Sequence, residues 1–318
     1  MSELPRWPGN AAHIAVALLL VTTALVMAER KVGPADFVGT PPIDPPPIER
    51  IDTYATPPAP GVAHAPTAVL LNDGRLAAYW FSGAQEAGRD VQLRMAIFAG
   101  GTWDASVPVT DVARTGGDER VYVNTLGNPI VFRHPNGEFW LIYVSSIGGW
   151  SASSLNLMRS SDGIAWGPAK RLSTSPFFNI STLLRGAPLY RSDGLVLVPA
   201  YHELIRTFPE FLLINADGQV VDRVRLNQAC TMQAWPIALG GGKAVALLRQ
   251  AGCSLRRLWI ATTTDGGVTW QGPHPTDIAN PDSPAAAVRL ADGRIVAVLN
   301  NSEEGSATSI LSSRETAG

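Results

Sequence analysis

Short runs of apolar residues, each interrupted by a tight turn, recur along most of the chain. Five segments share the order apolar strand, turn, second apolar strand, and they begin at Ala68, Ile130, Ala187, Pro236 and Ala287. Their turns contain Asp-Gly, Asn-Gly or Gly-Gly, dipeptides that supply the positive φ angles of two-residue hairpins. The turn glycines, spaced by 48 to 63 residues, are Gly74, Gly137, Gly194, Gly242 and Gly293. The pattern predicts a series of β-hairpins.

A third apolar strand follows each hairpin after a polar loop. These third strands begin at Val91, Ser154, Glu210, Arg257 and Thr308. A second turn then leads toward a fourth strand, so each repeat predicts a four-stranded antiparallel sheet of roughly 50 residues. One such sheet cannot cover both of its faces, whereas several sheets packed radially can. The expected fold class is therefore all-β, a propeller of four-stranded blades.

Two of the second turns place an aspartate between a hydroxyl residue and a closing tryptophan. One is "TTDGGVTW", from Thr263 to Trp270, and the other is "SSDGIAW", from Ser160 to Trp166. A short carboxylate here can accept hydrogen bonds from backbone N–H groups of its own turn, as in Asx turns. Gly267 permits the bend in the first turn. We therefore interpret Asp265 and Asp162 as turn-building residues, and expect Trp270 and Trp166 to pack between neighbouring sheets.

The N-terminal part of the chain has a different character. Residues 14–28, "IAVALLLVTTALVMA", carry no charge and follow a short segment that contains Arg6. A run of this length is typical of a signal peptide, and residues 1–32 are assigned to it. An uncleaved signal anchor that includes residues 11–28 is the alternative, and it would attach the protein to a membrane. Residues 33–61 are proline-rich and predict a semi-rigid linker, and residues 62–318 form the expected propeller.

Composition narrows the range of partners. Charged residues make up 16% of the chain and the formal net charge is -2, without a basic tract, so nucleic acid is not an expected partner. Cys230 and Cys253 lie at the two ends of one predicted hairpin. In an exported protein, periplasmic or extracellular, they can form a disulfide; two separate thiols are the alternative. No metal site and no cofactor are predicted.

The turn motifs, the repeat length and several short segments resemble the sialidase (neuraminidase) superfamily. Thr263, Asp265, Gly267, Thr269 and Trp270 match the full pattern of the Asp box, also called the BNR repeat. More narrowly, "WFSGAQEAGRD" from Trp80 is similar to the first blade of bacterial sialidase-like proteins. Further similar segments are "GNPIVF" from Gly127, "YHE" from Tyr201, "LLR" from Leu247 and "NPDS" from Asn280. The resemblance covers roughly residues 62–318.

This resemblance implies a six-bladed propeller that hydrolyses a terminal acidic sugar of the sialic acid class. Sialidases hold the substrate carboxylate with three arginines, and they use an Asp as acid/base and a Tyr activated by a Glu as nucleophile. A guanidinium group suits this task because it is always charged and binds a carboxylate in a bidentate manner. Two departures stand out here: no Arg-Ile-Pro segment lies near the start, and the last blade is expected to be missing or incomplete.

Alternation of strand direction predicts which loops can carry a site. The tight hairpins and Asp boxes share one face, while the longer loops between strands 2 and 3 and the links between blades share the other. Among the loops, we single out Glu86, Asp90 and Glu203 as catalytic candidates, and Arg249, Asn300 and Trp150 as substrate-binding candidates. The links between blades add His64, Asn128, Arg185, Gln233, Asn280 and Asp282, of which Arg185, Asn280 and Asp282 are assigned to substrate binding.

The leading hypothesis is an exported, sialidase-like exo-glycoside hydrolase acting on a glycan. In it, Glu86 or Asp90 is the acid/base, Arg185 and Arg249 hold the acidic sugar, and Glu203 assists or replaces a nucleophile. The alternatives are an inactive, truncated form of such an enzyme, and a non-catalytic propeller that binds glycans or protein.

Overall fold

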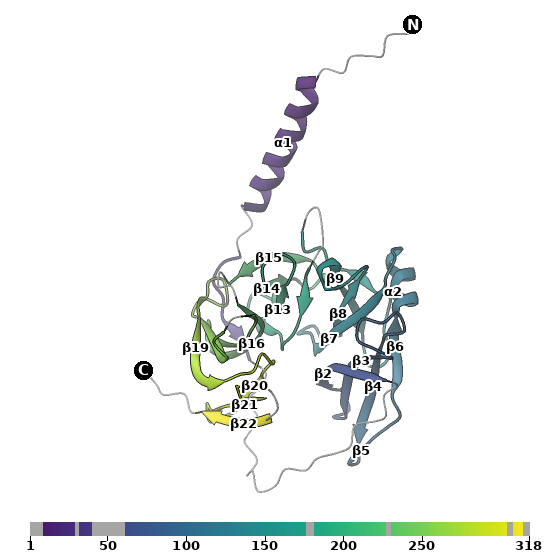
Figure 1. Cartoon of the computed structure of the whole chain (residues 1–318), viewed down its shortest axis with the longest axis vertical. Coiled ribbons are helices and arrows are strands. Elements are labelled where there is room, and N and C mark those ends of the chain that lie inside the picture. Colours follow the sequence, from purple (N-terminus) through teal and green to yellow (C-terminus); the bar gives the residue numbers. More distant parts are fainter. Residues whose placement is uncertain are drawn as a thin grey trace. The chain divides into compact units, whose positions relative to one another are not determined.

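A computed structural model describes most of the chain. The described residues are 9–28, 32–39, 61–175, 181–226, 230–252, 254–303 and 308–313. The chain divides into two compact units, Met1–Gly33 and Pro34–Gly318. The first unit contains helix α1 (Gly9–Ala28), and the second contains the strands (Figure 1).

Helix α1 has apolar side chains on all of its faces. Its exposed residues include Ile14, Val16, Leu18, Leu19 and Val21. Among the described residues, no helix meets both the length and the hydrophobicity needed to cross a lipid bilayer. Export and membrane attachment of this segment stay predictions.

The second unit is all-β, and its antiparallel sheets are arranged as the blades of a propeller (Figure 1). The first blade contains β2 (Val62–Leu70), β3 (Leu76–Gly83), β4 (Gln92–Ala99), β5 (Thr102–Trp103) and β6 (Val107–Asp111). The second contains β7 (Thr125–Arg133), β8 (Phe139–Ser146), β9 (Ser153–Ser160) and β10 (Lys170–Arg171). The third contains β11 (Leu183–Leu184), β12 (Leu189–Arg191), β13 (Val196–His202), β14 (Phe208–Ile214) and β15 (Val220–Arg225). The fourth contains β16 (Thr231–Gly240), β17 (Lys243–Gln250), β18 (Arg257–Thr263) and β19 (Gln271–Ala279).

A further sheet has three strands, β20 (Ala286–Arg289), β21 (Ile295–Asn300) and β22 (Thr308–Ser313). The described residues therefore form four blades of at least four strands each, together with this smaller sheet. They confirm the all-β propeller but not the count of six blades that the resemblance implied.

Three short elements were not foreseen from the sequence. Strand β1 (Phe37–Val38) comes from the segment predicted to be a linker and pairs with β12 of the third blade, where Phe37 is buried. Helix α2 (Val112–Glu119) follows β6, and the Asp111 side chain caps its N-terminus by accepting from the Arg114 N–H. A third short element, η1, is a 3-10 turn over Trp150–Ala152.

The faces between blades bury the apolar side chains that the strand pattern predicted. Trp140, Tyr143 and Phe139 of β8 are fully buried, as are Phe211 of β14 and Leu93 of β4. Strands covered on both faces are apolar at successive positions, and β8 is buried along its whole length. Hydrophobic burial between the blades thus holds the strand ends, and the loops that follow them, in place.

Each Asp box forms a turn closed by its own side chains. The Asp265 carboxylate accepts from the N–H groups of Val268 and Thr269, both at 3.0 Å, and from the hydroxyls of Thr263 at 2.8 Å and Thr269 at 2.6 Å. The Trp270 ring stacks on Phe211 of the preceding blade at 4.5 Å.

The second box repeats this arrangement. The Asp162 carboxylate accepts from the N–H groups of Ile164 at 2.8 Å and Ala165 at 2.9 Å. The Trp166 ring meets Tyr79 of the preceding blade edge-on at 5.8 Å. Both acids therefore serve the turns in which they lie, at the hairpin end of the blades.

Replacing Asp265 with alanine should lower the free energy of unfolding by about 2 kcal/mol at neutral pH, because several hydrogen bonds to a charged acceptor are lost. Partial burial acts to raise the pKa of the Asp265 carboxyl, but the bonds from Thr269 and Thr263 outweigh it and hold the pKa below its ordinary value. A lowered pKa stabilises the fold above the unfolded-state value of about 3.9, and this contribution is lost as pH falls through the folded-state pKa. Denaturant unfolding at several pH values measures it, with Asp277→Ala, an exposed position on β19, as control. An equal loss in both variants, or a difference that persists at low pH, would contradict this role.

Candidate functional site

Strand β13 ends at the loop face, the side of the propeller that carries the loops between second and third strands. Tyr201 and Glu203 lie two positions apart there, so their side chains leave the strand on the same side. Two neighbouring blades approach this point through bulges in β7 and β16. Asn128 and Gln233 lie in these bulges with positive φ angles of 43° and 51°. A bulge redirects a side chain, and here it directs both amides to the same phenol.

Tyr201 is the centre of a group that we call the Tyr201 cluster, formed with Asn128, Gln233, Arg185, Arg249, Glu203 and Asp282. The Tyr201 side chain is buried, and its hydroxyl oxygen accepts from Asn128 Nδ2 and Gln233 Nε2, both at 3.2 Å. Burial raises the pKa of the Tyr201 phenol, and the bond from Gln233 only partly offsets this effect. Tyr201 therefore stays neutral, and its hydroxyl proton remains available for donation.

Arg249, near the end of β17, is held on one side by its neighbours. Its Nε donates to Asp282 Oδ1 at 2.6 Å and its Nη1 donates to Gln233 Oε1 at 3.0 Å. Asp282 itself lies in the link after the fourth blade, with a positive φ of 71°. These contacts fix the guanidinium plane beside Tyr201.

Arg185 differs from Arg249 because it has no such partner. Within the described residues its guanidinium makes no hydrogen bond or ion pair, although the side chain is half-buried. Burial lowers the pKa of Arg185; interaction with Tyr201 acts against this and the nearby charge of Arg249 adds to it. Two guanidinium groups close to each other, one of them uncompensated, form a site for an anion.

The backbone after Arg185 is held closely against the fourth blade. Gly186 has a positive φ of 107°, and a Cβ at this position would lie 2.3 Å from the carbonyl oxygen of Ala234. Only glycine fits such an approach. The link therefore has to be Arg-Gly for Arg185 to reach its position.

Glu203 supplies the carboxylate of the cluster. Its backbone N–H donates to Ser181 Oγ at 2.9 Å, which fixes the chain where it leaves β13. Burial raises the pKa of the Glu203 carboxyl, Arg249 lowers it and Asp282 raises it, and the net change is upward. A carboxyl group with a raised pKa beside Arg249 suits acid/base chemistry.

The two acids of the first blade lie apart from the cluster. Asp90 is exposed, and its Oδ2 accepts from the Ala84 N–H at 2.6 Å, so the side chain closes its own loop. Glu86 is exposed as well, 4.0 Å from His64 Nε2. No contact within the described residues joins either acid to Tyr201, Arg185 or Glu203. The structure thus unites Glu203, Arg185, Arg249 and Asp282 but not Glu86 and Asp90.

The other three predicted substrate-binding residues, Asn280, Trp150 and Asn300, lie outside the Tyr201 cluster. Asn280 is buried, and its side chain both donates to the Ser283 carbonyl and accepts from the Ser283 N–H, so it shapes a turn. Trp150 lies against Gly127, where a Cβ would meet its ring at 2.8 Å, and it therefore adjoins the backbone that carries Asn128. Asn300 is the last residue of β21 in the three-stranded sheet.

The structure describes only one of the two cysteines that were predicted to pair. Cys230 is disulfide-bonded, while Cys253 lies outside the described residues, so the pairing stays a prediction. The Cys230 carbonyl accepts from the Ala251 N–H at 2.8 Å, which joins the two chain segments next to Arg249.

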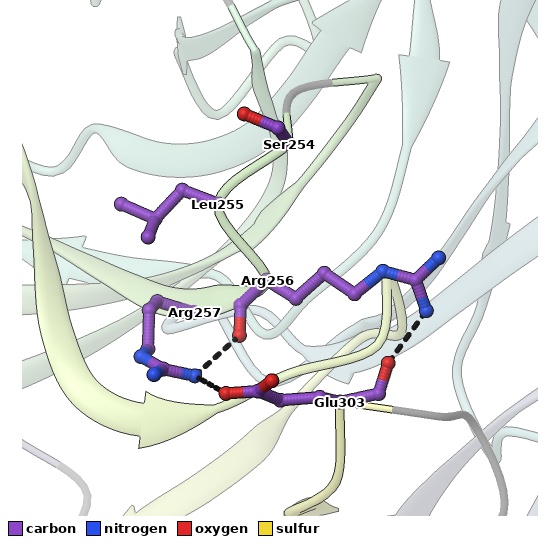
Figure 2. Close-up of a pocket in the computed structure, with 5 residues that line it drawn as sticks. All are labelled: Ser254, Leu255, Arg256, Arg257 and Glu303. Atoms are coloured by element: carbon purple, nitrogen blue, oxygen red, sulfur yellow. Dashed lines mark hydrogen bonds and ion pairs between the residues drawn. The ribbon is translucent and has the colours of Figure 1, made fainter.

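An open hollow of about 500 Å³ lies on the loop face between the fourth blade and the last sheet. It is lined by Ser254, Leu255, Arg256, Arg257 and Glu303 (Figure 2). Figure 2 shows the Arg257 guanidinium directed at the Glu303 carboxylate, with which it forms an ion pair, while Arg256 Nη1 donates to the Glu303 backbone carbonyl. The Arg256 carbonyl accepts from the N–H of Asn280, which lies two residues before Asp282 of the cluster.

In the part of the chain that the structure describes, no group of three His, Cys, Asp or Glu residues is arranged to hold a metal ion. The chemistry available in the Tyr201 cluster is that of two guanidinium groups, a phenol, two amides and two carboxylates.

Sequence reasoning missed Tyr201 as a site residue. It stands in the segment "YHE", and strand alternation places it on the same side as Glu203, so the necessary signal was present. Asn128 and Gln233 were recognised only as polar residues of the inter-blade links. Their shared partner depends on bulges, which the sequence pattern does not indicate.

The sequence profile of the BNR repeat-like domain family matches residues 74–317. Among curated proteins the sequence has no match. Solved structures with the same fold include the Hadza microbial sialidase Hz136, with a TM-score of 0.67 and 16% identity over 80% of this chain and 56% of that one. They also include the NanB sialidase from Streptococcus pneumoniae, with a TM-score of 0.62 and 10% identity over 83% of this chain and 60% of that one.

An exo-1,5-alpha-L-arabinanase from a bovine ruminal metagenomic library has the fold too, with a TM-score of 0.51 and 12% identity over 83% of this chain and 95% of that one. At such low identities, these likenesses establish the fold alone. This chain spans little more than half the length of the two sialidases.

Proposed function

This chain belongs to the BNR repeat-like domain family, and we propose that it is a sialidase-like exo-glycoside hydrolase that removes a terminal acidic sugar from glycans. The observation that carries the proposal is the half-buried Arg185 guanidinium, which faces Arg249 and Tyr201 without a counter-ion among the described residues. A sugar carboxylate would supply that counter-ion. Sialidases and an arabinanase share this fold, so the fold leaves the sugar open and the two arginines favour an acidic one.

The residues of the Tyr201 cluster take distinct roles in this proposal. Arg185 and the free edge of Arg249 bind the carboxylate of the sugar. The Tyr201 hydroxyl donates a hydrogen bond to the bound ligand. Its oxygen already accepts from the amides of Asn128 and Gln233, so the O–H remains free to point toward the ligand. Glu203 is the carboxyl group that transfers protons or attacks the anomeric carbon.

The test is incubation of the full chain with a fluorogenic α-sialoside and, separately, with a fluorogenic α-L-arabinofuranoside. We expect release of the fluorophore from the sialoside only. Release from the arabinofuranoside alone would contradict the proposal, because the cluster would then be serving a neutral sugar.

A non-catalytic glycan-binding propeller is the second candidate, and one observation favours it. The acids expected to act as acid/base, Glu86 and Asp90, are exposed and separate from the cluster within the described residues. If this second function holds, the protein is retained on sialylated glycans but does not hydrolyse the fluorogenic sialoside.

Replacing Asp282 with asparagine should move the acidic limb of the pH–activity profile to lower pH. The charge of Arg249 lowers the pKa of Glu203, and the charge of Asp282 raises it. Asparagine at position 282 removes the negative charge and keeps that of Arg249, so the pKa of Glu203 falls. If the ionised carboxyl is the active form, activity then appears at lower pH. The pH dependence of kcat/KM measures the limb, with Asp277→Asn as control. An upward shift, or an equal shift in the control, would contradict the proposed coupling.

A further inference from the structure

The loops that surround the Tyr201 cluster end in exposed apolar side chains. Ile205 follows Glu203 by two positions and is 89% exposed, and Leu204 beside it is also exposed. Ile147 after β8 and Leu255 after β17 occupy the corresponding loops of the blades on either side. Tyr122, in the link between the first and second blades, adds an exposed aromatic ring. Apolar side chains thus project from four connections on one face of the propeller.

Arginines without carboxylate partners accompany these apolar side chains. Arg206 follows Ile205, Arg256 follows Leu255, and Arg120 precedes Val121 and Tyr122 in the sequence; all three arginines are exposed. The exposed Arg89 guanidinium lies over the Tyr122 ring at 5.7 Å. Within the described residues, these four arginines, Arg89, Arg120, Arg206 and Arg256, form no ion pair with a carboxylate.

Arginines of the tight turns on the opposite face are arranged differently. Arg75, Arg191 and Arg294 each pair with an aspartate two residues away, at N–O distances of 2.6 to 2.7 Å. Their charges are compensated where they stand. Within the described residues, the four arginines beside the apolar loop tips lack this compensation.

Acidic groups on the loop face offset the arginines only in part. Asp282 is paired with Arg249, and Glu303 with Arg257. Asp90 is bound to the Ala84 N–H in its own loop, and Glu86 lies beside His64. Glu203 of the Tyr201 cluster forms no ion pair within the described residues, so the four arginines share the loop face with three carboxylates that lack an arginine partner, Glu86, Asp90 and Glu203.

We infer that the loop face of this propeller docks on a lipid bilayer that carries anionic headgroups. Exposed apolar side chains and arginines on the same loop tips match such a surface, because the former enter the boundary of the acyl region while the latter meet the headgroup charge. Docking in this orientation turns the Tyr201 cluster toward glycans attached to the bilayer surface. Contact with lipid requires only these loop tips and does not depend on hydrolysis of a sugar by the cluster.

The experiment uses the full chain with an environment-sensitive fluorophore attached to a single introduced cysteine under non-reducing conditions. Ile205→Cys labels the loop face, and Ile164→Cys, an exposed isoleucine in the Asp-box turn on the opposite face, is the matched control. Both proteins contain α1, so a difference between the two labels reports the propeller alone. Vesicles of phosphatidylcholine and phosphatidylglycerol at a ratio of about 7:3 supply the anionic surface.

We expect vesicles to blue-shift and intensify the emission at position 205 and to leave position 164 unchanged. Replacing Arg206 and Arg256 with glutamine should raise the lipid concentration at half-maximal signal roughly 30-fold, because each cation at an anionic surface contributes about fivefold to binding. Thermal unfolding of the labelled variants confirms that they are folded. An unchanged signal at position 205, an equal signal at position 164, or equal binding to pure phosphatidylcholine would overturn the inference.

Discussion

Replacing Arg185 with methionine should lower kcat/KM for a sialoside, and the affinity for free sialic acid, by roughly 100- to 1,000-fold, as expected when one partner of a desolvated charge pair is removed. Methionine keeps much of the side-chain volume, so the loss reports charge and hydrogen bonding more than packing. Arg185 makes no hydrogen bond to another described residue, and therefore its removal should leave the free energy of unfolding nearly unchanged. Enzyme kinetics, calorimetry and denaturant unfolding give the three values.

Two further variants identify the cause of that loss. Arg185→Lys keeps a charge but loses the planar fork, so an intermediate affinity is expected. Arg75→Met removes an arginine that is paired with Asp73 on the opposite face and should bind sialic acid as the unmodified chain does. If Arg185→Met retained full affinity, the anion site would have to lie elsewhere.

Replacing Glu203 with glutamine should lower kcat by roughly 10²- to 10⁴-fold while KM changes little, the usual range for loss of a group that transfers protons. Glutamine preserves shape and removes the titrating carboxyl whose pKa burial raises. The backbone bond from Glu203 to Ser181 does not depend on the side chain, so the end of β13 should keep its position. Steady-state kinetics on the fluorogenic sialoside measure both parameters.

Asp90→Asn is the matched comparison for Glu203→Gln. The amide oxygen of asparagine can still accept from the Ala84 N–H, and Asp90 has no contact with the cluster within the described residues. Its kcat should therefore stay close to that of the unmodified chain. The reverse outcome, a large loss in Asp90→Asn and none in Glu203→Gln, would transfer the acid/base role to the first blade.

The architecture was largely readable from the sequence because its signals are local. Asp-Gly and Asn-Gly turns set the hairpins at Gly74, Gly137, Gly194 and Gly293, and period-two apolar patterns set the strands around them. Strand β1 was not readable, because Phe37 and Val38 acquire their pairing from β12, more than 150 residues away in the sequence. Helix α2 was missed as well, since "VARTGGDE" has two glycines and little helical pattern.

The sequence predicted part of the site, because strand order determines the face on which a loop residue lies. Arg185, Arg249, Glu203 and Asp282 could be placed on one face from strand order alone, and the structure brings them together. The tyrosine at their centre was passed over because a buried Tyr on an apolar strand is usually core. Its role depends on Asn128 and Gln233, whose positive φ angles arise in bulges of two other blades. Glu86 and Asp90 shared the face but not the cluster, because strand order fixes a face and not the distance across it.

In the proposed function, the Tyr201 cluster recognises the carboxylate of a terminal acidic sugar. Calorimetric titration of the full chain with sialic acid, and then with its methyl ester, tests this most directly because the two ligands differ in one charge. We predict binding of the acid and a loss of roughly 100-fold or more for the ester, as for removal of one partner of a desolvated charge pair. Equal affinity for both ligands, or no binding of the acid, would show that the cluster does not recognise the sugar carboxylate.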